Sequence, residues 1–290
     1  MNTKPFGPKG KALARITQVI DEFTTSELVN SAFLAGVRYF DVSLESAQVM
    51  FASTLSSIRD ASILSVTIQD ALDIKTQVEL QSHIDKVIAT LGSTYVDVVL
   101  LSGGSMELFT GKTPHFEWLR QCKSKGLIHA FGVSVPSYEE FKWVVERGNV
   151  DVIEVKFNLF YQTPAAIFPF VKAKKTVLIA KSPLENGWLS GKTTDQTIPS
   201  ILNSLTKPNQ EQKRSILIER LKKVVRAEDL IPSALAFIFS YDAIYGASLA
   251  IHTEDELNQY LQAETMVLSY KQKNDLIDFY NQQIKNQPLI

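Results

Sequence analysis

The chain has 290 residues, of which 45% are hydrophobic, and a (β/α)₈ barrel commonly occupies about 250 residues as one domain. Because 30 basic residues oppose 31 acidic ones, the net charge of −1 gives no overall field for nucleic acid or an anionic membrane. Cys122 is the only cysteine, and no window approaches the roughly 20 apolar residues of a membrane span. We therefore expect a soluble, cytoplasmic protein without internal disulfides, whose partners are small molecules or proteins.

Eight short apolar runs alternate with helical stretches along the chain, which predicts a parallel sheet covered by helices. Continuously apolar runs of this length are typical of strands that are buried on both faces, and eight such strands close a barrel. The first run contains Arg15 and Gln18, so a hairpin or the start of a helix is an alternative there. The predicted strands are residues 12–20, 37–43, 61–68, 96–101, 128–134, 150–158, 176–182 and 247–252.

Three helix starts carry a hydroxyl side chain three residues before a glutamate, which is the pattern of a capping box. The amphipathic segments after two of them end near Gly36 and Gly148, where glycine favours helix termination. The three pairs are Thr24 with Glu27, Ser137 with Glu140, and Thr253 with Glu256.

One single domain over residues 1–290 accommodates all predicted elements. Residues 192–209 have a polar composition without helical or strand periodicity, and long loops of this kind are often functional, so we expect a lid there. Residues 266–284 form an amphipathic pattern that predicts a C-terminal helix packed on the outside of the barrel.

Four strings at the ends of the predicted strands resemble the aldo-keto reductases. They are AGVRYFD at 35–41, LGSTYVD at 91–97, GVS at 132–134 and SPLENGWLSGK at 182–192, and they follow the order of that family. The resemblance implies a (β/α)₈ barrel and NADPH-dependent carbonyl reduction, an oxidoreductase activity. It also implies four catalytic residues, namely an aspartate, a tyrosine acid, a lysine that lowers the pKa of the tyrosine, and a histidine that orients substrate.

Only the aspartate of these four is matched, by Asp41. No tyrosine occurs between Tyr39 and Tyr95, while Thr67 stands where the lysine belongs and Ser102 where the histidine belongs. A serine or threonine hydroxyl has a pKa far above 7 and does not replace a tuned phenol without an adjacent base. The sequence therefore predicts a divergent member of the family, a pseudoenzyme or a repurposed barrel.

The cofactor positions implied by the resemblance are only partly retained. Glu256 and Tyr260 stand where an arginine and an asparagine would hold the 2′-phosphate, so NADPH is disfavoured and we expect no NAD(P) binding or weak binding. Glu256 is also explained as half of a capping box. The candidate cofactor contacts that remain are Ser134, Ser182, Leu184, Gly187 and Lys192.

Charged residues take the place of neutral ones at the predicted barrel mouth. Lys181 replaces an aromatic ring, Glu154 replaces a glutamine, and Lys156 lies on the same strand face as Glu154. Together with Asp41 these residues form either a rebuilt site or an ion network that plugs a vacated pocket, and the sequence leaves both open. The candidate catalytic residues are Asp41, Lys181, Glu154 and Ser102.

Three functions stay open: loss of ordinary carbonyl reduction, an active NAD(P)-dependent oxidoreductase with another proton donor, and a lysine-dependent lyase or isomerase centred on Lys181. The four histidines are scattered without ligand spacing, so no metal site is expected. Aromatic residues cluster between Phe157 and Phe170, which indicates core packing or a contact with a protein partner or a second copy. A small-molecule ligand at the mouth is the main partner expected.

Overall fold

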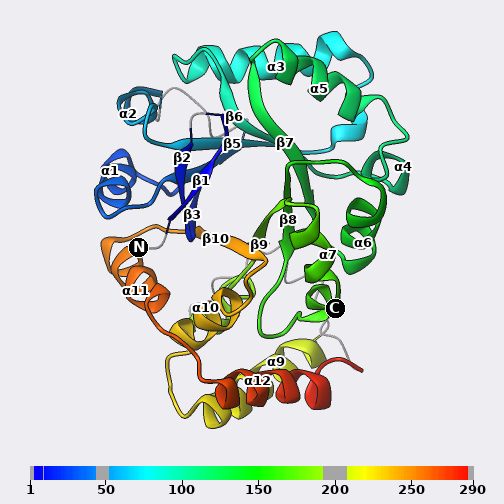
Figure 1. The fold of residues 1–290 in the computed structure, drawn as a ribbon. Helices are drawn as coiled ribbons and strands as arrows, with labels where there is room; N and C mark the ends of the chain where they lie inside the picture. The colour runs from blue at the N-terminus through cyan, green and yellow to red at the C-terminus, as the bar shows by residue number, and fades with distance from the viewer. Residues whose placement is uncertain (1–2, 9, 44–51, 192–207, 287–290) are drawn as a thin grey trace.

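The computed structural model describes residues 3–8, 10–43, 52–191 and 208–286. Its centre is a closed barrel of eight parallel strands, each paired with the next, with the last strand returning to the first (Figure 1). The predicted (β/α)₈ barrel is therefore confirmed. The strands are β3 (Ile16–Ile20), β4 (Tyr39–Ser43), β5 (Ile63–Ile68), β6 (Val96–Leu101), β7 (Ile128–Val135), β8 (Val152–Lys156), β9 (Val177–Lys181) and β10 (Ile244–Ala250).

The prediction of one strand over residues 12–20 is wrong, and the hairpin alternative is correct for its first part. Strand β2 (Lys11–Ala14) pairs antiparallel with β1 (Thr3–Phe6), and the first barrel strand, β3, begins only at Ile16. The strand is interrupted at Arg15, whose carbonyl accepts a hydrogen bond from the amide of Ala247 in β10. The single apolar run thus contains residues of two separate strands, β2 and β3.

Helices surround the barrel, and α9 and α12 lie side by side beyond it (Figure 1). The helices are α1 (Ser26–Leu34), α2 (Ala52–Ser57), α3 (Gln77–Thr90), α4 (Met106–Phe109), α5 (His115–Ser124), α6 (Tyr138–Arg147), α7 (Phe168–Ala173), α9 (Pro208–Val225), α10 (Ile231–Phe239), α11 (Glu254–Glu264) and α12 (Tyr270–Gln283). Short 3₁₀ turns are η1 (Ala71–Asp73), η2 (Thr163–Ile167) and η3 (Trp188–Ser190). No described helix is both long enough and apolar enough to cross a membrane.

Two of the predicted helix starts illustrate how side chains set helix boundaries. The capping box at α6 is confirmed, because Ser137 accepts from the amide of Glu140 while the carboxylate of Glu140 accepts from the amide of Ser137. The box that begins at Thr24 is wrong. The hydroxyl of Thr25 caps α1 instead by accepting from the amide of Leu28.

The segments that follow β9 and α11 differ in part from their predicted ranges. Most of the predicted lid lies at 192–207, outside the described residues, and 208–209 already belong to α9. The predicted helix at 266–284 is α12, which is capped by Ser269 and begins only at Tyr270. Among the clustered aromatics, Phe157 and Phe168 are buried in the core, whereas Phe170 is exposed.

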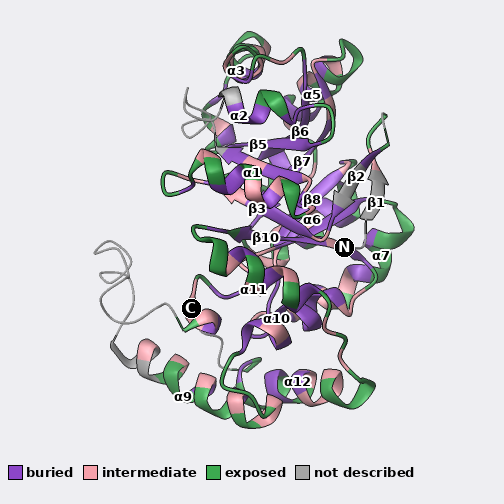
Figure 2. Cartoon of the chain, turned by 90° about the vertical axis from the view of Figure 1, so that its left-hand side faces the viewer, coloured by how far each residue is buried: buried purple, intermediate pink, exposed green. Residues whose placement is uncertain are grey.

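The barrel interior is apolar toward the amino ends of its strands and polar toward their carboxyl ends. The strands are almost entirely buried (Figure 2), and an inner apolar cluster fills the barrel toward the amino ends of the strands. Further along the same inward faces the side chains become polar, so the mouth at the carboxyl ends is the polar end. The inner cluster consists of Tyr39, Ile63, Val98, Leu100, Ala130, Val152, Val177 and Ile179.

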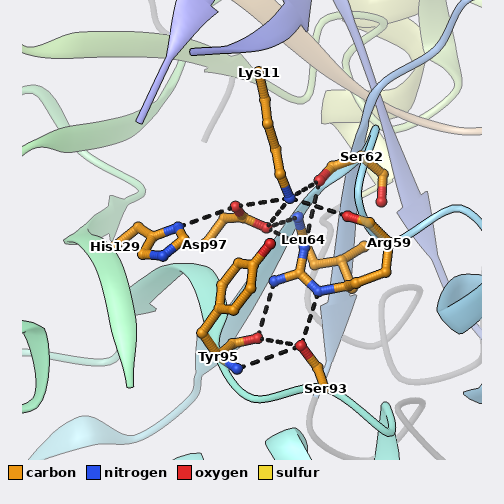
Figure 3. A network of polar contacts seen from close by, with 8 residues as sticks. All are labelled: Lys11, Arg59, Ser62, Leu64, Ser93, Tyr95, Asp97 and His129. Atoms are coloured by element: carbon orange, nitrogen blue, oxygen red, sulfur yellow. Dashed lines mark hydrogen bonds and ion pairs between the residues drawn. The ribbon is translucent and has the colours of Figure 1, made fainter. Parts of the chain in front are cut away.

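A buried ion network joins the hairpin to the amino-terminal end of the barrel (Figure 3). The carboxylate of Asp97, at the start of β6, lies 3.1 Å from Lys11 Nζ of the hairpin and 2.5 Å from Arg59 Nη1. It also accepts a hydrogen bond of 3.0 Å from the amide of Leu64 in β5. One buried carboxylate thus pairs with a lysine and an arginine, and this network joins the hairpin to β5 and β6 at the amino-terminal end of the barrel.

Candidate functional site

A cavity of about 540 Å³ opens at the carboxyl ends of the barrel strands. Such a volume is typical of a small-molecule site, and this end of the barrel carries the active site in barrel enzymes. Its inner part is lined by Asp41 of β4, Thr67 of β5, Glu154 of β8 and Lys181 of β9. The strands thus bring the predicted Asp41, Glu154 and Lys181 into one cavity.

Glu154 is the most extensively bonded residue of this cavity. Its carboxylate is buried and accepts hydrogen bonds from the hydroxyls of Ser134, at 2.7 Å, and Ser248, at 2.6 Å. Lys181 Nζ lies 3.3 Å from the same carboxylate and donates to Ser134 Oγ at 2.8 Å. The side chain of Lys181 is 41% exposed, so its ammonium is held by Glu154 while it faces the cavity.

The carboxyl of Asp41 is partly buried, and its pKa is raised above that of an ordinary aspartate. Burial raises the pKa of this carboxyl to about 7, and the negative charge of Glu154 contributes to the rise. Hydrogen bonding from the hydroxyl of Ser65 and the charge of Lys181 oppose it. At neutral pH Asp41 is therefore divided between its protonated and ionised forms, which is the range that acid–base chemistry uses.

Lys156 does not join this cluster, which corrects the prediction that two acids and two bases converge. Its ammonium pairs instead with the carboxylate of Glu185 at 3.1 Å, and it does not line the cavity. Glu185 is buried and also accepts from the side-chain amide of Asn158 at 2.6 Å, with Arg214 at 3.7 Å. The strand alternation placed Lys156 on the inward face, but the loop after β9 supplies its partner.

The loop after β9 forms one wall of the cavity. Of the predicted cofactor contacts, Ser182, Leu184 and Gly187 line the cavity, and Lys192 lies outside the described residues. Ser182 and Glu185 have φ angles of 50° and 49°, in the left-handed region that costs roughly 1 kcal/mol for such side chains. The buried ion pairs of Glu185 explain how this strained loop keeps its shape.

Amide groups of this loop are largely used within the loop itself. The amide of Gly187 donates to the carbonyl of Leu184 at 3.2 Å, and that of Leu189 donates to the same carbonyl at 3.1 Å. The amide of Ser190 donates to the carbonyl of Gly187. These three donors therefore do not point to the cavity as free amide groups.

The outer part of the cavity is acidic. Asp21, Glu22 and Glu256 line it together with His252 and Tyr260. His252 Nε2 lies 2.8 Å from the Asp21 carboxylate, and its backbone amide donates to Glu256 at 2.6 Å. Glu256 therefore bonds the residue before the Thr253 cap, so the predicted capping box at α11 has only its Thr253 half.

Two hydroxyls of the site were not predicted, and one predicted residue lies elsewhere. Ser65 and Ser248 bond Asp41 and Glu154, but small hydroxyl residues within apolar strands carry no distinctive pattern. The usable signal was strand pairing, because Ser65 lies directly opposite Asp41 in the β4–β5 register. Ser102 follows β6 and does not line the cavity.

A closed barrel of eight parallel strands, with its polar cavity at their carboxyl ends, defines the class as a (β/α)₈ barrel protein. The model of the Aldo/keto reductase family matches residues 10–280, and the chain belongs to this family. The family assignment predicted from the strand-end strings is thus confirmed.

Known relatives agree with this assignment at low identity. A protein described as uncharacterized oxidoreductase YqkF, from Bacillus subtilis (strain 168), is 21% identical over 184 residues, 63% of this chain and 60% of that protein. The aldo-keto reductase AKR11C1 from Bacillus halodurans, in its holo form, superposes with a TM-score of 0.79 at 15% identity over 100% of both chains. The glycerol dehydrogenase AKR11B4 from Gluconobacter oxydans gives a TM-score of 0.76 at 17% identity, over 97% of this chain and 96% of that chain. At these identities the structural likenesses show a shared fold.

Proposed function

We propose that this aldo-keto reductase-family barrel has lost ordinary NADPH-dependent carbonyl reduction and binds another small molecule at its mouth. The observation that carries the proposal is the environment of Asp41. The residue opposite it on β5 is Ser65, and the next inward residue on that strand is Thr67, so β5 supplies no lysine ammonium beside the aspartate. The catalytic arrangement that the family resemblance implies needs that ammonium to lower the pKa of a tyrosine.

No tyrosine of the described residues replaces the missing proton donor. Tyr39 is 2% exposed in the barrel interior, and burial together with the charge of Asp41 raises its pKa well above the ordinary value. Tyr260 lines the outer cavity, but burial raises its pKa as well. A phenol that acts as an acid at neutral pH needs the opposite shift, because proton transfer is most efficient when the pKa lies near the working pH.

The described lining of the cavity does not fit a nicotinamide dinucleotide phosphate. Such a cofactor brings several phosphate charges, which proteins bind with arginine, lysine and free backbone amides. Here the outer cavity carries three carboxylates against one histidine, and three loop amides are already bonded. At the inner end the ammonium of Lys181 is held by Glu154. Like charges repel, so these residues disfavour the cofactor.

Steady-state assays with NADPH and a panel of aldehydes test the proposal. We expect no protein-dependent oxidation of NADPH above background, whereas an active aldo-keto reductase in the same assay gives a clear rate. Turnover that scales with the concentration of this protein, and that disappears in Asp41→Asn, would overturn the proposal. Repeating the assay with NADH tests a cofactor that lacks the 2′-phosphate.

A second candidate is an active NAD(P)-dependent oxidoreductase with a non-standard proton donor. It is favoured by Asp41, which faces the cavity with a pKa of about 7 and so holds a transferable proton at neutral pH. This candidate predicts a rate that falls as pH rises through 7. The lysine-dependent alternative remains a prediction, and trapping by borohydride with a carbonyl compound, lost in Lys181→Ala, would support it.

A further inference from the structure

The polar cluster at the cavity is one positive charge short. The carboxylate of Glu154 has the ammonium of Lys181 beside it, at 3.3 Å. No described basic group lies within ion-pair distance of the carboxylate of Asp41, whose protein partner is the hydroxyl of Ser65. Two carboxylates thus share one ammonium at the wall of the cavity, and an unpaired charge is costly in partly buried surroundings.

Thr67 provides an independent indication of a binding position at this place. Its side chain is 5% exposed and lines the cavity, and its hydroxyl lies close enough to Asp41 to lower the pKa of that carboxyl, yet it makes no hydrogen bond of normal geometry among the described residues. Thr67 lies two residues after Ser65, so both point to the inner face of β5, next to Asp41. Buried polar groups are nearly always bonded, so a hydroxyl that lines a cavity without a protein partner is available to bond a ligand or water there.

The hydrogen-bonding character of the cluster defines the ligand. The hydroxyl proton of Ser65 is used on Asp41, and those of Ser134 and Ser248 are used on Glu154. Around Asp41 the acceptor sites therefore outnumber the donors, because the carboxylate has about four acceptor sites and Thr67 adds an oxygen with a single O–H donor. A primary ammonium has three donors and no acceptor, together with the missing charge.

From this geometry we propose that the mouth binds a small organic cation by a primary ammonium group, seated between the Asp41 carboxylate and the Thr67 hydroxyl. The inference rests on the proposed function, which leaves the cavity to a ligand other than a nicotinamide nucleotide. The outer carboxylates of Asp21, Glu22 and Glu256 extend the negative potential along the cavity, so the rest of the ligand is neutral or basic and carries no carboxylate.

Isothermal titration calorimetry of the full chain tests this proposal with ethanolamine hydrochloride and choline chloride. The two probes share a cation and a hydroxyl, but choline has no N–H donor. We expect saturable binding of ethanolamine and an affinity for choline at least about tenfold lower, the difference expected for a charge-assisted hydrogen bond. Equal affinities, no binding of ethanolamine, or binding of magnesium chloride in its place would overturn the proposal.

Two substitutions locate the binding position. Asp41→Asn keeps the size of the side chain and the acceptor for Ser65, and should weaken ethanolamine binding at least about tenfold. Thr67→Val removes only the hydroxyl and should weaken binding several-fold, while Asp278→Asn, an exposed change on α12, should leave it unaltered. Undiminished binding in both cavity variants would contradict the assignment.

The pH profile of binding gives a second readout. The ammonium binds the ionised carboxylate, and the pKa of Asp41 is about 7, so the affinity should rise about tenfold from pH 6 to pH 8. The charged groups that face Asp41 are Glu154 from β8 and Lys181 from β9, and His252 lines the outer cavity. The variant His252→Gln should keep the rise. If ethanolamine fails to bind while NADPH turnover is also absent, this inference fails and the proposed function stands.

Discussion

Asp41 and Glu154 face the same cavity from opposite sides of the barrel, and after burial the charge of Glu154 is the largest cause of the raised pKa of Asp41. Their strands, β4 and β8, are separated by three strands in either direction around the closed sheet. Lys181 pairs with Glu154 at 3.3 Å, whereas Asp41 has no ion-pair partner among the described residues and accepts from the hydroxyl of Ser65. This imbalance makes Asp41 the titrating group of the site near neutral pH.

Stability should depend on pH through Asp41. The folded chain keeps a proton on this carboxyl up to a pKa of about 7, whereas an unfolded aspartate releases it near pH 3.9, so rising pH favours unfolding between these values. In Asp41→Asn this penalty is absent. The free energy of unfolding of the variant relative to the natural chain should therefore increase by up to about 3 kcal/mol from pH 5 to pH 8.

Urea denaturation at the two pH values measures this difference. Asp278→Asn is the matched control, because Asp278 is exposed on α12 and its substitution should leave the pH dependence unchanged. A constant stability difference between Asp41→Asn and the natural chain across this range would show that Asp41 titrates normally.

The charge of Glu154 should be visible in the titration of Asp41. Replacement of Glu154 by glutamine removes the negative charge across the cavity, and the pKa of Asp41 should fall toward the ordinary aspartate value. Carbon-13 NMR of the aspartate carboxyl groups measures it, with the Asp41 signal assigned by its absence in Asp41→Asn. Glu146→Gln, at an exposed helix position, should not move the midpoint. An unchanged midpoint in Glu154→Gln would contradict the coupling across the barrel.

The ion network at the barrel floor should contribute strongly to stability. In Asp97→Asn the buried charges of Lys11 and Arg59 lose their counterion, and loss of one partner of a buried pair destabilises proteins by about 3–5 kcal/mol. Glu117→Gln breaks an exposed pair with Arg120 and should cost less than about 1 kcal/mol. Chemical denaturation compares the two variants. Similar small losses would mean that the Asp97 ion pairs contribute little and that the hairpin is held by its other contacts, including those of Lys11 with the carbonyls of Arg59 and Ser62.

The barrel was predictable because apolar strand runs and strand-end strings repeat along the sequence. Asp41, Glu154 and Lys181 each lie on an inward strand face near the mouth, so alternation within a strand was enough to bring them together. The start of β3 at Ile16 could not be predicted from the apolar pattern. A single apolar run covers both β2 and β3, and only the hydrogen bonding at Arg15 separates them.

The partners of the charged residues could not be predicted in the same way. Alternation predicts that Lys156 shares the strand face of Glu154, but its pairing with Glu185 depends on a loop whose left-handed backbone has no periodic sequence pattern. Ser65 and Ser248 define the bonding of the two cavity carboxylates, yet a serine in a strand looks alike whether or not it faces a carboxylate. That Glu154 has a cationic partner and Asp41 has none among the described residues becomes clear only when the contacts of both carboxylates are compared.

Equilibrium binding of NADPH, followed by nicotinamide fluorescence, tests most directly whether this cavity has lost the dinucleotide. Because the described outer cavity is acidic and Lys181 is held by Glu154, we expect no saturable binding up to millimolar concentration, with NADH behaving alike. Saturable binding of NADPH in the micromolar range, displaced by NADP⁺, would contradict the account and return the site to nicotinamide chemistry.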